Sequence, residues 1–193
     1  MERRAQIVQA AFELFAERGF RGASLGQVAA RVGLTNAGVL HHFASKEELL
    51  ISVLAERDRE DEAAVEQALP RDGSLHTALE RSRAVVAHNV GQPGLVQAFT
   101  VLAAESVTED HPAQQFFRER YARFRARIAA DLERDGHLAT QETVLAATLM
   151  LAVMDGLQVQ WLLAPDEVDM EATFTLFERM LEDGLLQPRP STP

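Results

Sequence analysis

"VGLTNAGVLHHFASKEELL", residues 32–50, leaves room for only one short helix, over residues 36–42, between two longer helical segments. Gly33 is placed to end the helix before it, because glycine readily adopts the left-handed conformation found after helix ends. Ser45 with Glu48 three residues later is a capping-box pattern and opens the helix after it. The segment therefore predicts a short helix held between two longer ones.

Two helices are predicted before this segment. An apolar face that repeats every three or four residues marks the first, and Gly19 is placed to close it. Ser24 followed by Gln27 is a second capping box and opens the helix "LGQVAARV". The order helix, helix, turn, short helix is that of a helix-turn-helix braced by an N-terminal helix. We expect its core to contain Val28, Val32, Leu34, Val39, Phe43, Leu49 and Leu50.

Helical periodicity continues through the rest of the chain, and strand signals are nearly absent. Pro, Gly and Asp-Gly breakers divide this part into predicted helices at about residues 46–69, 74–90, 94–108, 112–134, 140–164 and 167–185. The predicted fold is all-α with about nine helices. We expect a helix-turn-helix head over residues 1–50, a helical effector-binding and dimerisation domain over 51–187, and a disordered tail over 188–193.

Composition narrows the class of protein. The 193 residues are 47% hydrophobic and 25% charged, as in ordinary globular proteins, and the absence of cysteine excludes disulfides and thiolate chemistry. The net charge of −10 is unevenly spread, because residues 1–50 hold six Arg and Lys against five Asp and Glu. We expect no signal peptide, and we expect the apolar run from Thr143 to be too short to span a bilayer before Asp155. A cytoplasmic protein is expected.

The adjacent histidines of the opening segment fit a metal site poorly. His41 and His42 diverge by about 100° on a helix, so they cannot chelate one ion from one face. Neither Glu-x-x-His nor His-x-x-x-His occurs in the chain. We therefore predict no metal and no cofactor.

A nucleic-acid surface uses the same residues better. Thr35 and Asn36 begin the short helix, where hydroxyl and amide groups can meet phosphates or base edges. Ala37 and Gly38 are small and would let the backbone approach a groove closely. Lys46 carries a positive charge at the N-terminus of a helix, where the helix dipole is also positive. This unfavourable placement indicates an external anion such as a DNA phosphate. A solvated lysine is the alternative.

The first quarter of the chain resembles the DNA-binding domain of the tetracycline-repressor-like (TetR) regulators. The match covers about residues 6–55 and rests on "AFELFAERGF", "SLGQVAARVGL" and "HHFASKEEL". The family commonly has a tyrosine at the position of Leu40 and often a groove-facing side chain at the position of Gly38. Together with the chemistry of the side chains described above, the resemblance implies DNA contacts by Ser24, Thr35, Asn36, Gly38, His41, His42 and Lys46.

The predicted helix over 140–164 contains an apolar stripe with small residues at its middle, which permits close helix approach. The last predicted helix adds further apolar residues. The TetR resemblance implies a four-helix bundle formed by these two helices and their symmetry mates. Completion of the monomer core is the alternative. The predicted interface consists of Leu145, Leu149, Ala152, Gly156, Val159, Leu163, Phe174 and Phe177.

A second stripe on the same helix carries polar groups among adaptable apolar ones. The resemblance implies an inducer pocket in this body, although such stripes are more often plain core. With aromatic and polar residues from earlier helices, the candidate effector residues are His88, Phe99, Phe117, Tyr121, Met154, Gln158 and Trp161.

The protein is predicted to be a homodimeric transcriptional repressor that binds double-stranded DNA. A small molecule is expected to release it from a palindromic operator. A constitutive DNA-binding dimer is the first alternative. A helical carrier or enzyme is the second, but no catalytic motif supports it, so we predict no enzyme.

Overall fold

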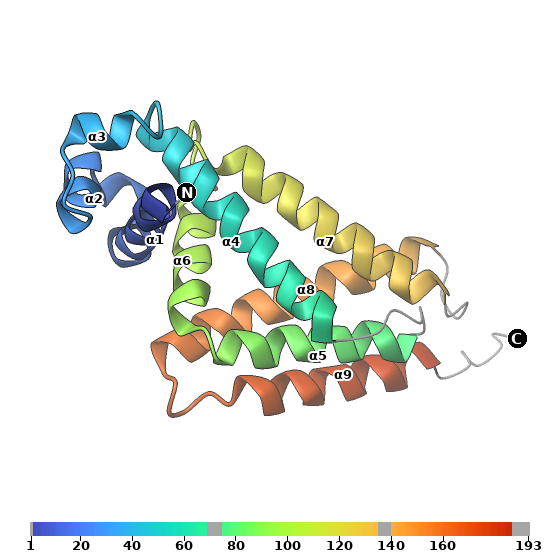
Figure 1. Ribbon diagram of the computed structural model, residues 1–193. Coiled ribbons are helices and arrows are strands. Elements are labelled where there is room, and N and C mark those ends of the chain that lie inside the picture. The colour runs from blue at the N-terminus through green and yellow to red at the C-terminus, as the bar shows by residue number, and fades with distance from the viewer. Residues whose placement is uncertain (1, 69–74, 135–139, 187–193) are drawn as a thin grey trace, which may run out of the picture. The chain divides into compact units, whose positions relative to one another are not determined.

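The computed structural model describes residues 2–68, 75–134 and 140–186, and over these residues it is all-α (Figure 1). This confirms the predicted fold class. The tail predicted for residues 188–193 lies outside the described residues. In chain order, the helices of the described part are α1 (Glu2–Gly22), α2 (Leu25–Arg31), α3 (Asn36–Leu40), α4 (Lys46–Ala68), α5 (Leu75–Val90), α6 (Pro93–Glu105), α7 (Gln114–Arg134), α8 (Thr140–Leu163) and α9 (Met170–Leu186).

The chain forms two compact units. The first combines residues 1–64 with residues 92–121, and the second combines residues 65–91 with residues 122–193. The first unit therefore contains α1, α2, α3 and α6, while the second contains α5, α8 and α9; α4 and α7 contribute to both. The head expected over residues 1–50 lies wholly within the first unit, and its boundary at residue 50 stays a prediction.

Local signals account for the boundaries of the first helices. The Ser24 side chain accepts a hydrogen bond from the Gln27 backbone N–H, and the Gln27 side chain accepts one from the Ser24 N–H, so the capping box is complete. Gly33, at φ 65°, follows the end of α2 as expected. Ser45 caps α4 through the Glu48 N–H.

Two details differ from the expected caps. The Glu48 carboxylate accepts from the Ala44 N–H, one residue earlier than a capping box requires. Gly19 has φ 66° as predicted, but the chain resumes helical geometry after it, so α1 is broken there and continues to Gly22. The break in α1 is used below.

The first unit has one apolar core, in which α1 packs against α2 and α6. Phe15, Phe43 and Leu50 are among its fully buried side chains. The predicted head core is confirmed: Val28, Val39 and Leu49 are also buried, and Val32 and Leu34 are partly buried against the same cluster. Arg31 joins α2 to α1 through an ion pair with Glu17, with 2.6 Å between Nη2 and Oε2.

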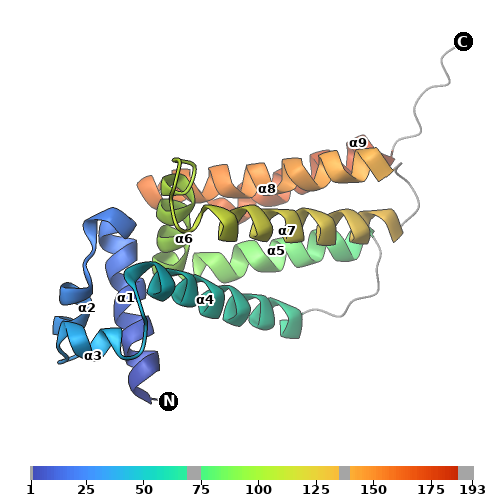
Figure 2. The ribbon, with the colours of Figure 1, turned by 90° about the horizontal axis from the view of Figure 1, so that it is seen from above.

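Among its described residues, the second unit buries two apolar clusters. Its last helix, α9, packs against α5 (Figure 1) and against α8, behind which it lies in Figure 2. Leu79, Leu132 and Met150 belong to one cluster. Phe174 belongs to the other and is 0% exposed within a single chain. The expectation that Phe174 lies at a dimer interface is therefore wrong, because its side chain is already enclosed by its own protomer. Phe177 is partly buried against both clusters.

Candidate nucleic-acid interface and apolar face

The turn between α2 and α3 fixes the orientation of the short helix. Thr35 is the N-cap of α3, and its hydroxyl oxygen accepts from the Gly38 N–H at 3.1 Å. Val39 is the residue of α3 that enters the core. One apolar anchor and one cap therefore hold a helix of five residues, in which Asn36, Ala37 and Leu40 are exposed to solvent.

Five of the polar residues predicted to contact DNA are exposed, and Lys46 is half-buried. Ser24, Thr35 and Asn36 lie at the start of α2 and α3, and α2 packs against α3. His41 and His42 follow α3, with their rings edge to face and their centroids 5.5 Å apart. The structure thus brings hydroxyl, amide and imidazole groups to the end of the head without assigning any of them to a base or a phosphate.

The two departures from the family pattern leave distinct features. Leu40 is exposed on α3, so an apolar side chain faces solvent where the family commonly has tyrosine. At Gly38 a Cβ would lie 3.4 Å from the Leu34 Cβ and 3.5 Å from the Thr35 hydroxyl, which are ordinary contacts. Gly38 is therefore half-buried against its own turn, and a small side chain fits there without strain.

Lys46 begins α4, but its ammonium is not simply solvated. Nζ lies 4.1 Å from the centroid of the Phe20 ring. The pKa of Lys46 is lowered overall, because the effect of burial outweighs that of the Glu47 and Glu105 carboxylates, which raise it. The positive charge is therefore held on an aromatic ring in the head.

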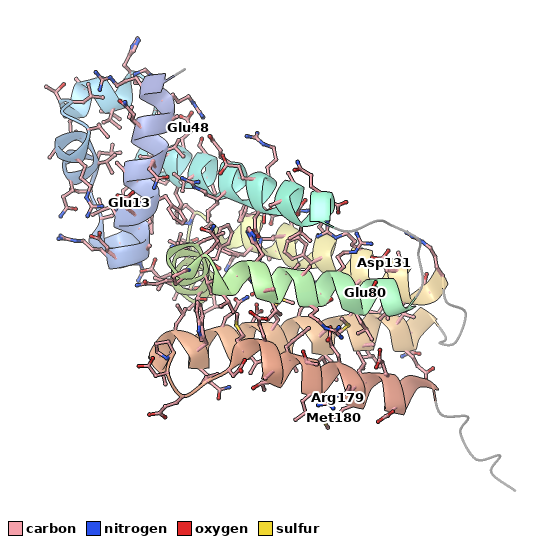
Figure 3. All side chains as sticks on the ribbon, turned by 60° about the horizontal axis from the view of Figure 1, so that its bottom comes forward. Glu13, Glu48, Glu80, Asp131, Arg179 and Met180 are labelled. Carbon is pink, nitrogen blue, oxygen red and sulfur yellow. The ribbon has the colours of Figure 1, made fainter. Side chains whose placement is uncertain are left out.

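A second surface lies on α8 and α9. Leu145, Leu149 and Leu163 of α8 are 63%, 51% and 80% exposed, and Ala152, Gly156 and Val159 between them are also exposed. Their spacing of three or four residues puts them on one side of the helix. On α9, Leu176 is half exposed and Met180 lies on the outer side of the helix (Figure 3). These eight residues are called the α8/α9 face.

The α8 helix is both long and apolar. By length and composition alone, Gln141–Leu163 could cross a membrane, and 39% of its most apolar stretch is buried within the protein. Asp155 does not prevent this, contrary to the expectation from sequence. A core helix of a water-soluble protein meets the same criterion, so the observation is weak evidence for a membrane span.

The candidate effector residues divide between the two units. Phe99, Phe117 and Tyr121 pack in or against the core of the first unit, where the Phe99 and Phe117 rings are edge to face with centroids 6.1 Å apart. Met154 and Trp161 pack in the second unit with Val86, Leu157, Met170 and Phe174. His88 and Gln158 are half-buried residues of the second unit.

A buried carboxylate lies between α5 and α9. Glu178 is 0% exposed, and its Oε2 accepts from Arg83 at 2.8 Å. Burial raises the pKa of Glu178; the hydrogen bond and charge of Arg83 lower it, and the charge of Glu182 raises it further. Oε1 is buried without a hydrogen-bond partner among the described residues.

Sequence reasoning missed three contributors to these surfaces. Leu176 escaped notice, although it lies four residues before Met180 and thus on the same side of α9. The pairing of Phe20 with Glu105 escaped as well, since nothing local marks a glutamate 85 residues away as a partner of Phe20.

The comparisons with known proteins fit this geometry. Residues 7–53 match the family model for bacterial regulatory proteins of the tetR family, and residues 78–186 match the BetI-type transcriptional repressor C-terminal region. The chain belongs to the TetR family of transcriptional regulators. The longer of the two matches is thus to the C-terminal region of a repressor type.

Two curated relatives illustrate the range of the match. The transcriptional activator FasR of Mycolicibacterium smegmatis is 38% identical over 68 residues, which cover 35% of this chain and 31% of FasR. The regulator BetI of Burkholderia mallei is 28% identical over 190 residues, which cover 97% of this chain and 95% of BetI. FasR is thus similar in a limited segment, whereas BetI is similar throughout.

Solved structures show the same fold. A transcriptional regulator from Rhodococcus sp. Rha1 superposes with a TM-score of 0.79 at 22% identity, covering 94% of this chain and 96% of that one. A regulator from Saccharomonospora viridis in complex with choline has a TM-score of 0.74 at 22% identity, covering 94% and 96%. FadR of Bacillus subtilis in complex with stearoyl-CoA has a TM-score of 0.72 at 17% identity, covering 93% and 98%.

Proposed function

We propose that this chain acts in the cytoplasm as a homodimeric repressor that binds an inverted-repeat operator and leaves it when a small molecule binds. The observation that carries the proposal is the presence of two exposed surfaces of opposite chemistry. One is polar and belongs to the head; the other is the apolar α8/α9 face.

The head alone is too small for tight, selective binding. One helix-turn-helix reads a few base pairs, and two-fold dimers on palindromic half-sites supply the remaining specificity. We assign base and phosphate contacts to Ser24, Thr35, Asn36, His41 and His42, a close backbone approach to Gly38, and a phosphate contact to Lys46.

A second copy of this chain is the partner that the α8/α9 face fits. Contiguous exposed apolar side chains on a soluble protein mark an interaction surface. Gly156 supports close helix approach, because a Cβ there would meet nothing within 4 Å in its own chain. Two copies of α8 and α9 would form a four-helix interface through Leu145, Leu149, Ala152, Gly156, Val159 and Leu163, with Leu176 and Met180, and with Phe177 at its inner edge.

The proposed effector site lies in the second unit, around His88, Met154, Gln158 and Trp161. These residues combine a thioether, an indole, an amide and an imidazole, which suits an apolar molecule with one or two polar groups. Phe99, Phe117 and Tyr121, which pack in or against the core of the first unit, stay separate candidates for effector contacts. The neighbours bound to choline and to stearoyl-CoA show that this fold accommodates small molecules in other proteins. Binding would favour a spacing of the two heads that no longer fits major-groove turns about 34–36 Å apart.

Selection of bound sequences from a random DNA pool tests the regulator proposal, followed by gel shift of the recovered site at fixed salt. Recovery of an inverted repeat bound by a dimer is the expected result. Recovery of no motif, with only weak salt-sensitive binding, would contradict it and favour a helical carrier or enzyme.

The recovered site then tests the effector. Choline and stearoyl-CoA are the two probes, and release of the operator fragment at constant ionic strength is the readout. Release by either probe supports a ligand-responsive repressor. A complex unaffected by both probes, and by a wider panel of small metabolites, would favour a constitutive DNA-binding dimer.

A further inference from the structure

The proposed phosphate contact, Lys46, is held by another side chain of the head. Its Nζ lies 4.1 Å from the centroid of the Phe20 ring, a distance at which the face of the ring attracts a cation. Within the described part of the chain, the structure records this ring contact for Lys46 and no ion pair, although the Glu47 and Glu105 carboxylates act on its charge at longer range. The ammonium is thus fixed in place while its charge stays available to an outside anion.

Phe20 is fixed in turn by Glu105, the last residue of α6. The Phe20 backbone N–H donates to Glu105 Oε2 at 2.7 Å. The break in α1 at Gly19 makes this possible, since the break frees the next N–H from the helix. A Cβ at Gly19 would overlap the Glu105 carboxylate and come within 2.8 Å of its Cδ.

His111 packs beside both Phe20 and Glu105. His111 packs edge-on against the Phe20 ring, with centroids 5.4 Å apart, and its Nε2 lies 3.8 Å from Glu105 Oε2. The Ala113 N–H donates to His111 Nδ1, so the proton of the neutral ring is on Nε2, facing Glu105. The pKa of His111 is lowered overall, chiefly by burial. The Glu105 carboxylate raises this pKa, and the Arg21 charge lowers it.

We propose that Glu105 is a positioning residue of the DNA-binding site: it fixes Phe20, and Phe20 holds the Lys46 ammonium ready for a DNA phosphate. This inference rests on the proposed function, in which Lys46 contacts a phosphate. Lysine has a flexible side chain, so holding it before binding reduces the entropy lost when the contact forms. Glu105 touches no DNA, and its effect passes entirely through Lys46.

The position of Glu105 connects this effect to the rest of the first unit. It ends α6, the helix that packs against α1, and so a displacement of the end of α6 would loosen Phe20 and Lys46 together. DNA affinity would then respond to α6 without any change in the short helix α3.

Glu105→Ala, Glu105→Gln, Lys46→Ala and the Glu105→Ala/Lys46→Ala double variant test the inference in the full-length protein. Dissociation constants are measured on a DNA site recovered by selection and on random DNA, across a range of salt. Lys46→Ala should weaken binding to both and lower the salt slope by nearly one phosphate contact per protomer. Glu105→Ala should weaken both roughly threefold to tenfold and lower the slope part of the way.

Two comparisons separate positioning from general damage to the fold. Glu105→Ala should have no further effect once Lys46 is alanine, and Glu105→Gln should bind nearly as the parent does, because its amide oxygen can still accept from the Phe20 N–H. Phe20→Leu keeps apolar packing but removes the ring face, so it should match Glu105→Ala. Glu109→Ala, an exposed position four residues later, is the control and should change nothing.

Independent losses from Glu105→Ala and Lys46→Ala would overturn the inference while leaving the phosphate contact standing. Equal damage from Glu105→Gln and Glu105→Ala would also overturn it, because the hydrogen bond would then not be the cause. Unchanged affinity and salt slope in Lys46→Ala would instead remove the proposed phosphate contact, and this inference with it.

Discussion

The two exposed surfaces of this chain differ in what covers them. At the end of the head, hydroxyl, amide and imidazole side chains surround α3, and a single leucine is exposed. On the α8/α9 face the exposed side chains are leucine, valine and methionine, with alanine and glycine between them. A polar surface loses little by facing water, whereas an apolar one gains free energy when another apolar surface covers it.

This difference indicates the kind of partner that each surface fits. The head fits a partner with phosphates and base edges, and its affinity for that partner should depend on salt. The α8/α9 face fits an apolar partner of matching shape, and its association should depend little on salt. Substitutions on the two surfaces should therefore fail in different ways.

Leu149→Glu should have the largest effect. A charge in the middle of the α8/α9 face would have to be buried unpaired in the proposed dimer, so we expect a folded monomer. Specific operator affinity should fall at least roughly a hundredfold, toward that for random DNA. Sedimentation and gel shift measure the two effects.

Val107→Glu is the matched control for this change. Val107 is 81% exposed and lies outside the α8/α9 face, so the same substitution there should leave a dimer. A Leu149→Glu protein that stays dimeric and binds its operator would place the interface elsewhere.

Asn36→Ala should have a smaller and more selective effect. Loss of a base contact costs about 1–3 kcal/mol on the cognate site, roughly fivefold to 150-fold in affinity, with little change on random DNA. Selection repeated with the variant should show a relaxed preference at one position of each half-site. Equal losses on cognate and random DNA would assign Asn36 to the phosphate backbone.

Glu178→Gln should have the smallest effect, and it tests the buried side of α9. Because burial raises the pKa of Glu178 above its ordinary value of 4.5, the folded chain binds more protons than the unfolded chain between the two values. The parent therefore loses stability as the pH rises through that window. The variant avoids this loss, and its amide oxygen can still accept from Arg83.

At pH 7 the Glu178→Gln protein should be at least as stable as the parent, with an expected gain of about 1 kcal/mol in the free energy of unfolding, or roughly 2–4 °C in Tm. The difference should vanish when the pH is below the ordinary glutamate pKa. Thermal melts at several pH values measure this. Glu171→Gln, on an exposed position of the same helix, is the control. A variant that melts lower than the parent at pH 7 would show that the Arg83 ion pair outweighs the cost of burial.

The sequence by itself determined the all-α class, the order of the helices and the helix-turn-helix. Capping residues, left-handed glycines and the 3.6-residue period act within about one helical turn, so they can be read without knowledge of distant residues. The complete Ser24 cap, the turn at Gly33 and the buried Val39 and Phe43 follow from such signals. The regulator class followed from the motifs of the same segment.

Only the tertiary structure decided which apolar side chains stay exposed. The α9 helix has two apolar sides: Phe174 and Phe177 pack inward with Glu178, while Leu176 and Met180 face outward. Spacing alone separates these two sets but does not say which one the other helices cover. The assignment of Phe174 to the interface failed for that reason.

Tertiary structure also decided the environment of Lys46. The positive charge of Lys46 at a helix start predicted an outside anion. The contact of Lys46 with Phe20 and the hydrogen bond from Phe20 to Glu105, however, join segments that are far apart in the chain. Such contacts depend on how α1 and α6 pack, and helix packing is a property of whole faces and not of local sequence.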